Sequence, residues 1–339
     1  MRAWKSHSYE KLSILTDYLE VFAKASSSAA NRVYLDAFAG ETLNRIAGTD
    51  RTFPGSAETA LEVKPPFTHV RLFELARKRV GELSELVADR PNARVVHGDC
   101  NVTIPAALTS LPMKAPTFAF LDPDGMELDW ATVRALADHK RAYAEEFDKS
   151  KVEMWILFST SGMVRMLGKN REAVGENRLL DKAARLYGAS GPLERVWEAK
   201  LAGEITGGEA QKAYLFLYMD RLADLGYQHL LVRPIHGSRG ELYAMVFASD
   251  HPAGANIMRV QMPEVSAALD AALGETDAAA RDAAFQGVCK ATNTNLPWAT
   301  MWVANRYGVA SAKLENFVWT PAPAGGPFQA HPEKWSVAQ

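Results

Sequence analysis

Acidic side chains end several of the apolar runs in this sequence. Asp36 closes VYLD, Glu74 closes HVRLFE, and Asp122 follows FAFL. A further acid, Asp99, stands in the turn GDCN after ARVVH. Carboxylates accept hydrogen bonds from hydroxyl, amino and ammonium groups. If the runs are parallel strands, their carboxyl ends meet at one edge of a sheet, where these acids could bind one ligand.

The turn after the first run limits the kind of ligand. Gly40 in YLDAFAG lets a ligand approach the backbone closely, because glycine has no Cβ. The fingerprint G-x-G-x-x-G is absent, which argues against a pyrophosphate cradle and ranks a hydride-transferring enzyme low. S-adenosylmethionine (SAM) has no phosphate and suits a shorter turn. We expect Asp36, Phe38 and Gly40 near its methionine part, although a plain strand-to-loop transition explains the stretch about as well.

The next two strand ends predict contacts to a nucleoside. Glu74 can accept hydrogen bonds from both ribose hydroxyls, and the alternative is an exposed strand end or a charge at the start of the next helix. Asp99 can accept from the adenine amino group. The alternative there is a helix cap, for which Asp and Asn are usual residues. Both roles can hold together, with Asn101 as the cap and Asp99 as the ligand-binding acid.

FAFLDPDGMELDW is the most specific stretch. A buried run delivers Asp122 to a turn made by Pro123 and Gly125. In amino-group methyltransferases an Asp-Pro or Asn-Pro at this place receives the target amine. We therefore predict Asp122 and Pro123 as the catalytic pair. The alternative is a turn in which the acid caps the following backbone.

The elements that must position these residues alternate along the chain. Such alternation predicts an α/β protein whose mostly parallel sheet is covered on both faces. The strands are expected at 33–38, 69–74, 93–97, 118–122, 153–159 and 229–234, with helices at 9–24, 57–63, 76–88, 102–111, 130–139 and 209–225.

The end of the alternation sharpens the fold class. HLLVRPIHGSRGELYAMVFAS reads as two strands joined by the turn GSRG. A mostly parallel seven-stranded sheet that ends in an antiparallel hairpin is the Rossmann-like layout of class I SAM methyltransferases. We expect this domain over 1–252 with a helical insertion at about 162–208, a helical or winged-helix-like region over 253–325, and a tail over 326–339.

The insertion is rich in charged residues. Arg165, Lys169 and Arg171 follow the fifth strand and should overhang the same edge as the acids. They could hold a phosphate backbone or another anionic substrate. A solvated helix pair of mixed charge explains them equally well, because acids are interspersed.

Bulk composition excludes several classes of protein. The 339 residues carry a formal charge of −2, so a uniformly basic nucleic-acid binder is excluded. The two cysteines form no disulfide framework, and the eight histidines show no metal-ligand spacing, so we predict no metal. The first 20 residues show no signal-peptide or membrane-spanning run. We expect a cytoplasmic protein without a membrane partner.

The sequence resembles the three-Cys-motif partner proteins (TcmP). The resemblance covers most of residues 5 to 260 and rests on KLSILTDYL, YLDAFAG, FPGSAETAL, LFE, GDCN, FLDPDG, SGMVRML and FASDHPAG. It implies a SAM-binding, methyltransferase-like domain, commonly a winged-helix-like C-terminal region, and association with a radical-SAM-type protein that carries the three cysteines.

Two departures from this family matter. Members usually have a second glycine soon after the first, where this chain has Glu41 and Thr42. The family's aromatic residue after Asp-Pro is here Asp124. An aromatic side chain there would stack on a flipped base, so the nucleobase interpretation needs Phe158 or Trp130 in that place.

Two functions remain open from the sequence. The first is a SAM-dependent methyltransferase that acts on an amino group of a nucleic acid or another anionic substrate. The alternative is a non-catalytic partner or adaptor that binds protein or nucleic acid and works with the radical-SAM-type protein.

Overall fold

The computed structural model describes residues 3–4, 6–46, 50–141, 143, 151–176, 178–237, 240–260, 314–315 and 336–337. The chain divides into two compact units, Met1–Gln261 and Met262–Gln339. The first unit contains the whole predicted SAM-binding region. None of the helices in the described ranges has the length and hydropathy that crossing a membrane requires.

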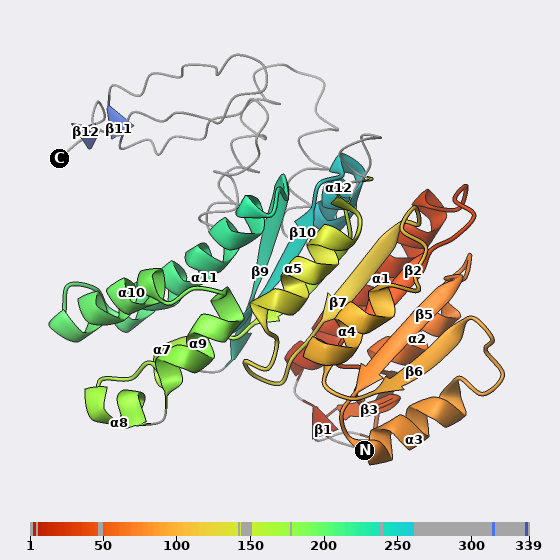
Figure 1. Ribbon diagram of the computed structural model, residues 1–339, viewed down its shortest axis with the longest axis horizontal. Helices are drawn as coiled ribbons and strands as arrows, with labels where there is room; N and C mark the ends of the chain where they lie inside the picture. Colours follow the sequence, from red (N-terminus) through yellow and green to blue (C-terminus); the bar gives the residue numbers. More distant parts are fainter. Residues whose placement is uncertain are drawn as a thin grey trace. The chain divides into compact units, whose positions relative to one another are not determined.

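Seven strands form the main sheet in the order β6-β5-β2-β7-β8-β10-β9 (Figure 1). Only β10 runs antiparallel to its neighbours. This confirms the predicted Rossmann-like, methyltransferase-like fold with its antiparallel hairpin. The strands are β2 (Val33–Asp36), β5 (His69–Glu74), β6 (Ala93–His97), β7 (Thr117–Leu121), β8 (Glu153–Phe158), β9 (His229–Gly237) and β10 (Gly240–Ser249).

Helices cover both faces of the sheet because the central strands are apolar on both sides. In the view of Figure 1, α4 and α5 lie in front of the strands and contact each other, whereas α1 contacts α2 and α12. The helices are α1 (Ser6–Ala25), α2 (Ser56–Glu62), α3 (Arg77–Leu86), α4 (Cys100–Leu108), α5 (Trp130–His139), α11 (Gly207–Asp224) and α12 (Pro252–Val260).

Aromatic side chains fill the core on each face. Under α1, the ring of Tyr18 lies 5.1 Å from that of Phe118, and Phe22 stacks on Phe67 at 6.0 Å. On the opposite face, Phe158 and Tyr218 have ring centroids 4.9 Å apart. Such pairs add to the free energy of area burial when the rings are tilted or edge-on. They fix the strands, and therefore the strand ends that carry the acids.

The segment that was predicted as an insertion contains four helices in the described ranges. It follows β8 and forms a lobe on the left of Figure 1. Its members are α7 (Thr160–Met166), α8 (Arg171–Glu176), α9 (Leu179–Tyr187) and α10 (Gly191–Ala202).

A small second sheet was not predicted. It joins β1 (Ala3–Trp4), β3 (Leu43–Ile46) and β4 (Thr52–Pro54) in the order β1-β3-β4. β3 begins three residues after Gly40, so the chain leaves the glycine turn directly into a strand.

The predicted C-terminal region falls largely outside the described residues. Within 253–339, the structure describes the remainder of α12 and two short strands, β11 (Leu314–Glu315) and β12 (Ser336–Val337), which pair antiparallel. α12 belongs to the first unit, where it packs on α1, β9 and β10. The winged-helix-like prediction for 253–325 and the predicted tail stay predictions.

Candidate active site

A pocket of about 370 Å³ lies at the carboxyl ends of β2, β5, β6 and β7. This is the edge where open parallel sheets bind their ligands. The sequence predicted five of its lining residues, and others come from α1, the second sheet, the start of α2, α3 and the loops that follow the strands. The predicted lining residues are Phe38, Gly40, Glu74, Asp99 and Asp122; Asp36, Asn101 and Pro123 do not line it.

Glu74 ties the glycine turn to the end of β5. Gly40 has a φ of +63°, a value that favours glycine, and its N–H donates to Glu74 Oε2 at 3.1 Å. The other oxygen accepts from the Ala76 N–H at 2.7 Å, and Arg79 Nη1 lies 3.7 Å from Oε2. A carboxylate has about four acceptor positions. Glu74 therefore retains acceptor capacity for a ligand while it holds the turn.

Asp36 lies beneath this turn and is fully buried. Its carboxylate accepts hydrogen bonds from Tyr34 Oη at 3.2 Å and from the Phe38 N–H at 3.3 Å. Burial raises the pKa of Asp36 to about 7, and the nearby Asp122 also raises it, while the bonds from Ser56, Tyr34 and Phe38 lower it. The geometry gives Asp36 a positioning role in the turn, because its side chain does not line the pocket.

Asp99 takes the capping role that the sequence gave to Asn101. Asp99, not Asn101, caps α4, because its Oδ1 accepts from the Asn101 N–H at 2.9 Å. The Asn101 amide instead bridges to the next segment: it donates to Glu127 O at 2.7 Å and accepts from Thr132 Oγ1 at 2.8 Å. It also accepts from the Asp129 N–H. Asp99 therefore both caps α4 and lines the pocket, whereas the combined interpretation from the sequence gave the cap to Asn101.

Asp122 forms an ion pair with Lys11 of α1. The side chains are 18% and 12% exposed, respectively. The other carboxylate oxygen, Oδ1, is buried and has no hydrogen-bond partner among the residues that the structure describes. A buried polar atom of this kind calls for an explanation, and a ligand that donates a hydrogen bond is one. Lys11 was not predicted. Its only sequence signal is its place in the KLSILTDYL motif.

The turn after Asp122 carries no aromatic ring into the pocket. Pro123 is buried, Asp124 is exposed, and Gly125 donates its N–H to Glu127 Oε2 at 2.7 Å. Neither substitute from the sequence lines the pocket, since Phe158 and Trp130 are buried and pack on Tyr218.

Residues that the sequence did not assign complete the walls. Phe53 of β4 and Leu75, which is 68% exposed, are apolar, and Ser56 lies at the start of α2. Gly55 lets two backbones approach: a Cβ there would lie 2.1 Å from Glu41 O. The stretch FPGSAETAL supplied the signal for three of these residues, but only as part of a family resemblance.

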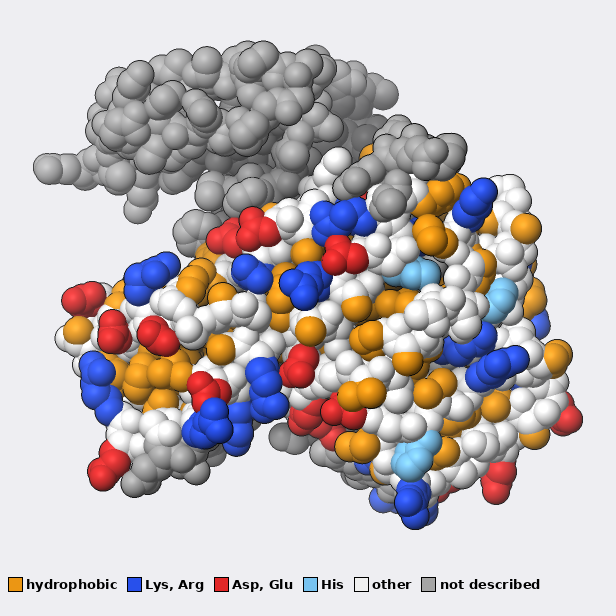
Figure 2. Space-filling model, viewed as in Figure 1, with side chains coloured by type: hydrophobic (Ala, Val, Ile, Leu, Met, Phe, Trp, Pro, Cys, Tyr) orange, Lys and Arg blue, Asp and Glu red, His pale blue; other side chains and the backbone are white. Residues whose placement is uncertain are grey.

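The basic residues of the insertion do not line the pocket. Arg165 lies in α7, and the guanidinium of Arg171 lies 5.5 Å from the ring centre of Trp197. Figure 2 shows Lys and Arg side chains on this lobe, across a hollow from a group of acidic side chains. The predicted substrate contacts of Arg165, Lys169 and Arg171 stay predictions.

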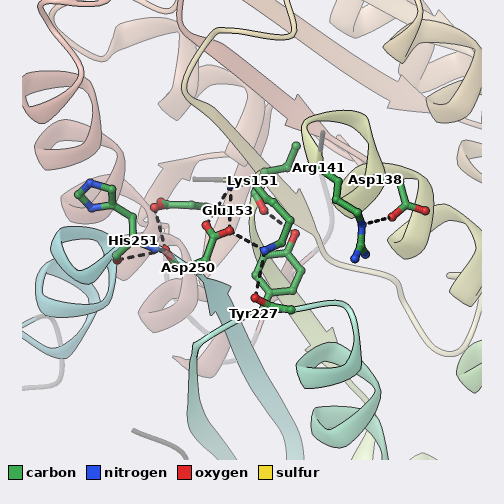
Figure 3. A network of polar contacts seen from close by, with 10 residues as sticks. Asp138, Arg141, Lys151, Glu153, Tyr227, Asp250 and His251 are labelled. Atoms are coloured by element: carbon green, nitrogen blue, oxygen red, sulfur yellow. Dashed lines mark hydrogen bonds and ion pairs between the residues drawn. The ribbon is translucent and has the colours of Figure 1, made fainter. Parts of the chain in front are cut away.

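A second polar cluster lies at the opposite, amino edge of the sheet (Figure 3). Glu153 begins β8 and is buried; Tyr18 Oη donates to its Oε2, and Ser249 Oγ donates to its Oε1 at 3.0 Å. Lys151 Nζ pairs with Asp250 Oδ2 at 2.5 Å. We call these five residues the amino-edge network. The stretch FASDHPAG contributes two of these five residues, Ser249 and Asp250, so we interpret its role as structural.

No group of three or more His, Cys, Asp and Glu side chains in the described ranges could hold a metal ion. Burial and the charges of Asp99 and Asp129 raise the pKa of the Cys100 thiol to about 12. Cys100 is therefore not an activated nucleophile, since the thiolate is the reactive form.

No protein-family model matches the chain. The resemblance to the TcmP family therefore stays a prediction. A stretch of 88 residues is 76% identical to a putative ABC transporter peptide-binding protein from Brucella melitensis, and 75% identical to one from Brucella ovis. It covers 26% of this chain and 17% of the length of those proteins. It concerns a quarter of the chain and does not identify the whole.

This chain resembles solved structures only with low TM-scores and low sequence identity. Protein LPL1258 from Legionella pneumophila has a TM-score of 0.44 at 11% identity, over 72% of this chain and 88% of that one. Fibrillarin from Aeropyrum pernix, with natively bound SAM, has a TM-score of 0.30 at 14% identity, over 69% and 76%. The putative methyltransferase yhhF from Escherichia coli has 0.27 at 19%, over 41% and 66%. The strand order, not these scores, supports the methyltransferase-like fold.

Proposed function

We propose that the chain binds SAM in the carboxyl-edge pocket and transfers its methyl group to an acceptor nitrogen held by Asp122. One observation carries the proposal: a single pocket brings together Gly40, Glu74, Asp99 and Asp122, which come from four successive strand ends. A chance arrangement would not place a glycine turn and three acids of different strands around one cavity at the ligand-binding edge.

The residues present fit the chemical groups of this cofactor. Glu74 has acceptor capacity for the ribose hydroxyls, and Asp99 has a carboxylate oxygen beyond its capping bond. Leu75 offers an exposed apolar surface for the adenine ring. Phe38 and Gly40 line the side where the methionine part would lie. The pocket thus offers separate residues for the ribose, the adenine and the methionine part of SAM.

The acceptor side depends on Asp122. When bound, SAM supplies a methyl group, whose transfer forms a C–N bond as the C–S bond breaks and S-adenosylhomocysteine is left. Asp122 Oδ1 can accept an N–H bond from the acceptor, orient its lone pair, and take up a proton that the alkylated nitrogen releases. Lys11 holds the second oxygen and so leaves Oδ1 as the free acceptor.

Calorimetric titration with SAM and S-adenosylhomocysteine tests the proposal. We expect binding near micromolar affinity, and a loss of about tenfold or more in Glu74→Ala. Glu62→Ala is the matched control, because Glu62 is an exposed acid that pairs with Arg90 away from the pocket. Well-folded protein that binds neither ligand would refute the proposal.

A second candidate is a partner or adaptor function with a radical-SAM-type three-Cys-motif protein or with nucleic acid. The observation in its favour is that the basic residues Arg165, Lys169 and Arg171 lie outside the pocket and can serve another surface. Nucleic acid that stays bound through purification and is released by moderate salt would support it.

A further inference from the structure

The pocket walls carry far more negative than positive charge. Among the residues that the structure describes, six acidic and two basic side chains line the cavity. Both basic groups pair with acids, since Lys11 contacts Asp122 and Arg79 lies 3.7 Å from Glu74. Asp99 and Glu127 accept backbone N–H groups, which cancel no charge. A cleft lined by one sign of charge attracts the opposite sign and repels its own.

A polyanionic acceptor does not fit such walls. Each phosphate that approached would meet Asp99 and Glu127, and like charges in a cleft cost free energy. The turn after Asp122 also brings no ring on which a flipped base could stack, because Asp124 stands where an aromatic residue was expected. The phenylalanine residues that line the pocket come from other elements, namely Phe38 from the glycine turn, Phe53 from β4 and Phe73 from β5. The basic side chains that would hold a phosphate backbone lie elsewhere, on the insertion.

The cavity also limits the width of the acceptor. At about 370 Å³ it is near the lower end of small-molecule pockets. A cofactor-sized ligand leaves little spare room, so the acceptor must enter with a narrow group. Asp122 Oδ1, buried and without a partner, needs a donor at that point.

We infer that the acceptor is an aliphatic primary amine carried by a positively charged molecule, and not a nucleic acid. The inference rests on the proposed function and names the substrate class of the same site. Asp122 receives the amino group, and Asp99 and Glu127 attract the remaining positive charge. Polyamines and lysine side chains share this chemistry.

Calorimetric binding tests the inference without a turnover assay. The probes are spermidine, the peptide acetyl-Lys-Ala-Lys-amide, and a single-stranded oligonucleotide of A and C, each titrated into the protein alone and into protein with S-adenosylhomocysteine. We expect at least one amine to bind more tightly than the oligonucleotide. Tighter binding of spermidine would identify a polyamine-type acceptor, and tighter binding of the peptide a lysine-type acceptor.

Two variants locate the binding. Glu127→Gln keeps an acceptor for the Gly125 N–H but removes an exposed charge, and should weaken amine binding about threefold. Asp122→Asn should weaken it about tenfold. Glu62→Gln removes an exposed acid on α2 and should leave amine binding unchanged. Tighter binding of the oligonucleotide, or amine binding that neither pocket variant changes, would overturn the inference.

A SAM titration of the same protein separates the two proposals. If SAM binds and neither amine does, the substrate class is wrong and the methyltransferase proposal stands. If an amine binds at Asp122 and SAM does not, the methyltransferase proposal is wrong and the pocket is an amine site.

Discussion

Two lysine–aspartate pairs lie at opposite edges of the main sheet, in different surroundings. At the amino edge, both oxygens of Asp250 accept from Lys151, and both oxygens of the adjacent Glu153 accept from hydroxyls (Figure 3). At the carboxyl edge, Asp122 pairs with Lys11 through one oxygen and keeps the other buried without a partner.

The difference separates a structural network from a binding site. A buried polar network whose members are all satisfied stabilises one arrangement of the chain. A buried acceptor without a donor costs free energy until a ligand supplies one. Under the proposed function, the same residue types at the ends of strands of one sheet serve the fold at one edge and a ligand at the other.

The largest expected effect is on stability at the amino edge. Glu153→Ala should lower the free energy of unfolding by about 3 kcal/mol or more, because it leaves the buried Tyr18 hydroxyl without its acceptor, removes one of the two acceptors of Ser249 and opens a cavity. Urea unfolding followed by circular dichroism measures this. Asp122→Ala, at the other edge, should cost less, because it also removes the buried Oδ1 that has no donor among the described residues. Equal losses in the two variants would remove the distinction between the edges.

The next effect is on turnover at the carboxyl edge. Once an acceptor is known, Asp122→Asn should slow methyl transfer about 100-fold and change SAM affinity by no more than about twofold. Initial rates and calorimetry measure the two quantities. Turnover that survives in this variant would refute the assignment of Asp122.

Lys11 should act through Asp122. Lys11→Met should slow transfer about tenfold, because the carboxylate loses the group that fixes one oxygen. Lys11→Arg should restore part of the rate, which a merely structural contribution of Lys11 would not require. A Lys11→Met rate equal to wild type would show that the ion pair is dispensable.

Stability measured over a range of pH compares the two edges of the main sheet, because each edge has a buried acid whose pKa is raised. Burial raises the pKa of Asp36 and of Glu153 to about 7, from 3.8 and 4.5. Between about pH 4 and 7 the folded state therefore binds more protons than the unfolded chain, so stability falls as pH rises. Glu153→Gln should remove roughly 2 kcal/mol of this decline.

Urea midpoints from pH 5 to 8 measure that decline. Asp36→Asn should remove the part of the decline in stability that Asp36 causes. This variant provides the comparison from the carboxyl edge. The pKa of Lys140 is lowered to about 8 by burial, so its contribution to the pH dependence begins only above that pH. A decline that persists unchanged in Glu153→Gln would show that Glu153 is not its source.

The smallest effect distinguishes two neighbours at the start of α4. Asn101→Ala should cost about 1–2 kcal/mol of stability, because three hydrogen bonds of its amide are lost. Asp99→Asn keeps a good cap and should change stability by less than about 0.5 kcal/mol, while SAM affinity falls. If both variants changed only stability, Asp99 would have no ligand role.

The sheet could be predicted from the sequence because its signals are local. β5 and β6 have the predicted bounds, since each is a short apolar or β-branched run next to a turn. The acids at strand ends followed from the same reasoning, because parallel strands share one carboxyl edge. β3 and β4 were missed, since runs of four and three residues are too short to show a period.

The contacts between distant segments could not be predicted. Nothing in the amphipathic pattern of α1 indicates that Lys11 meets Asp122, because periodicity gives the buried face and not the partner. The amino-edge network could not be predicted for the same reason, because its five residues come from α1, from the start of β8 and from the end of β10. The bridging role of Asn101 depends on where α5 packs, which its capping propensity does not reveal.

The position of α1 has a consequence for the order in which the site forms. Lys11 meets a residue 111 positions later in the chain, and Tyr18 meets one 135 positions later. Long-range contacts of this kind form late, because the intervening chain must first be ordered. During synthesis the first helix therefore waits until the fourth and fifth strands of the main sheet have emerged. We therefore expect the wall that Lys11 contributes to the pocket to form only after these strands are in place.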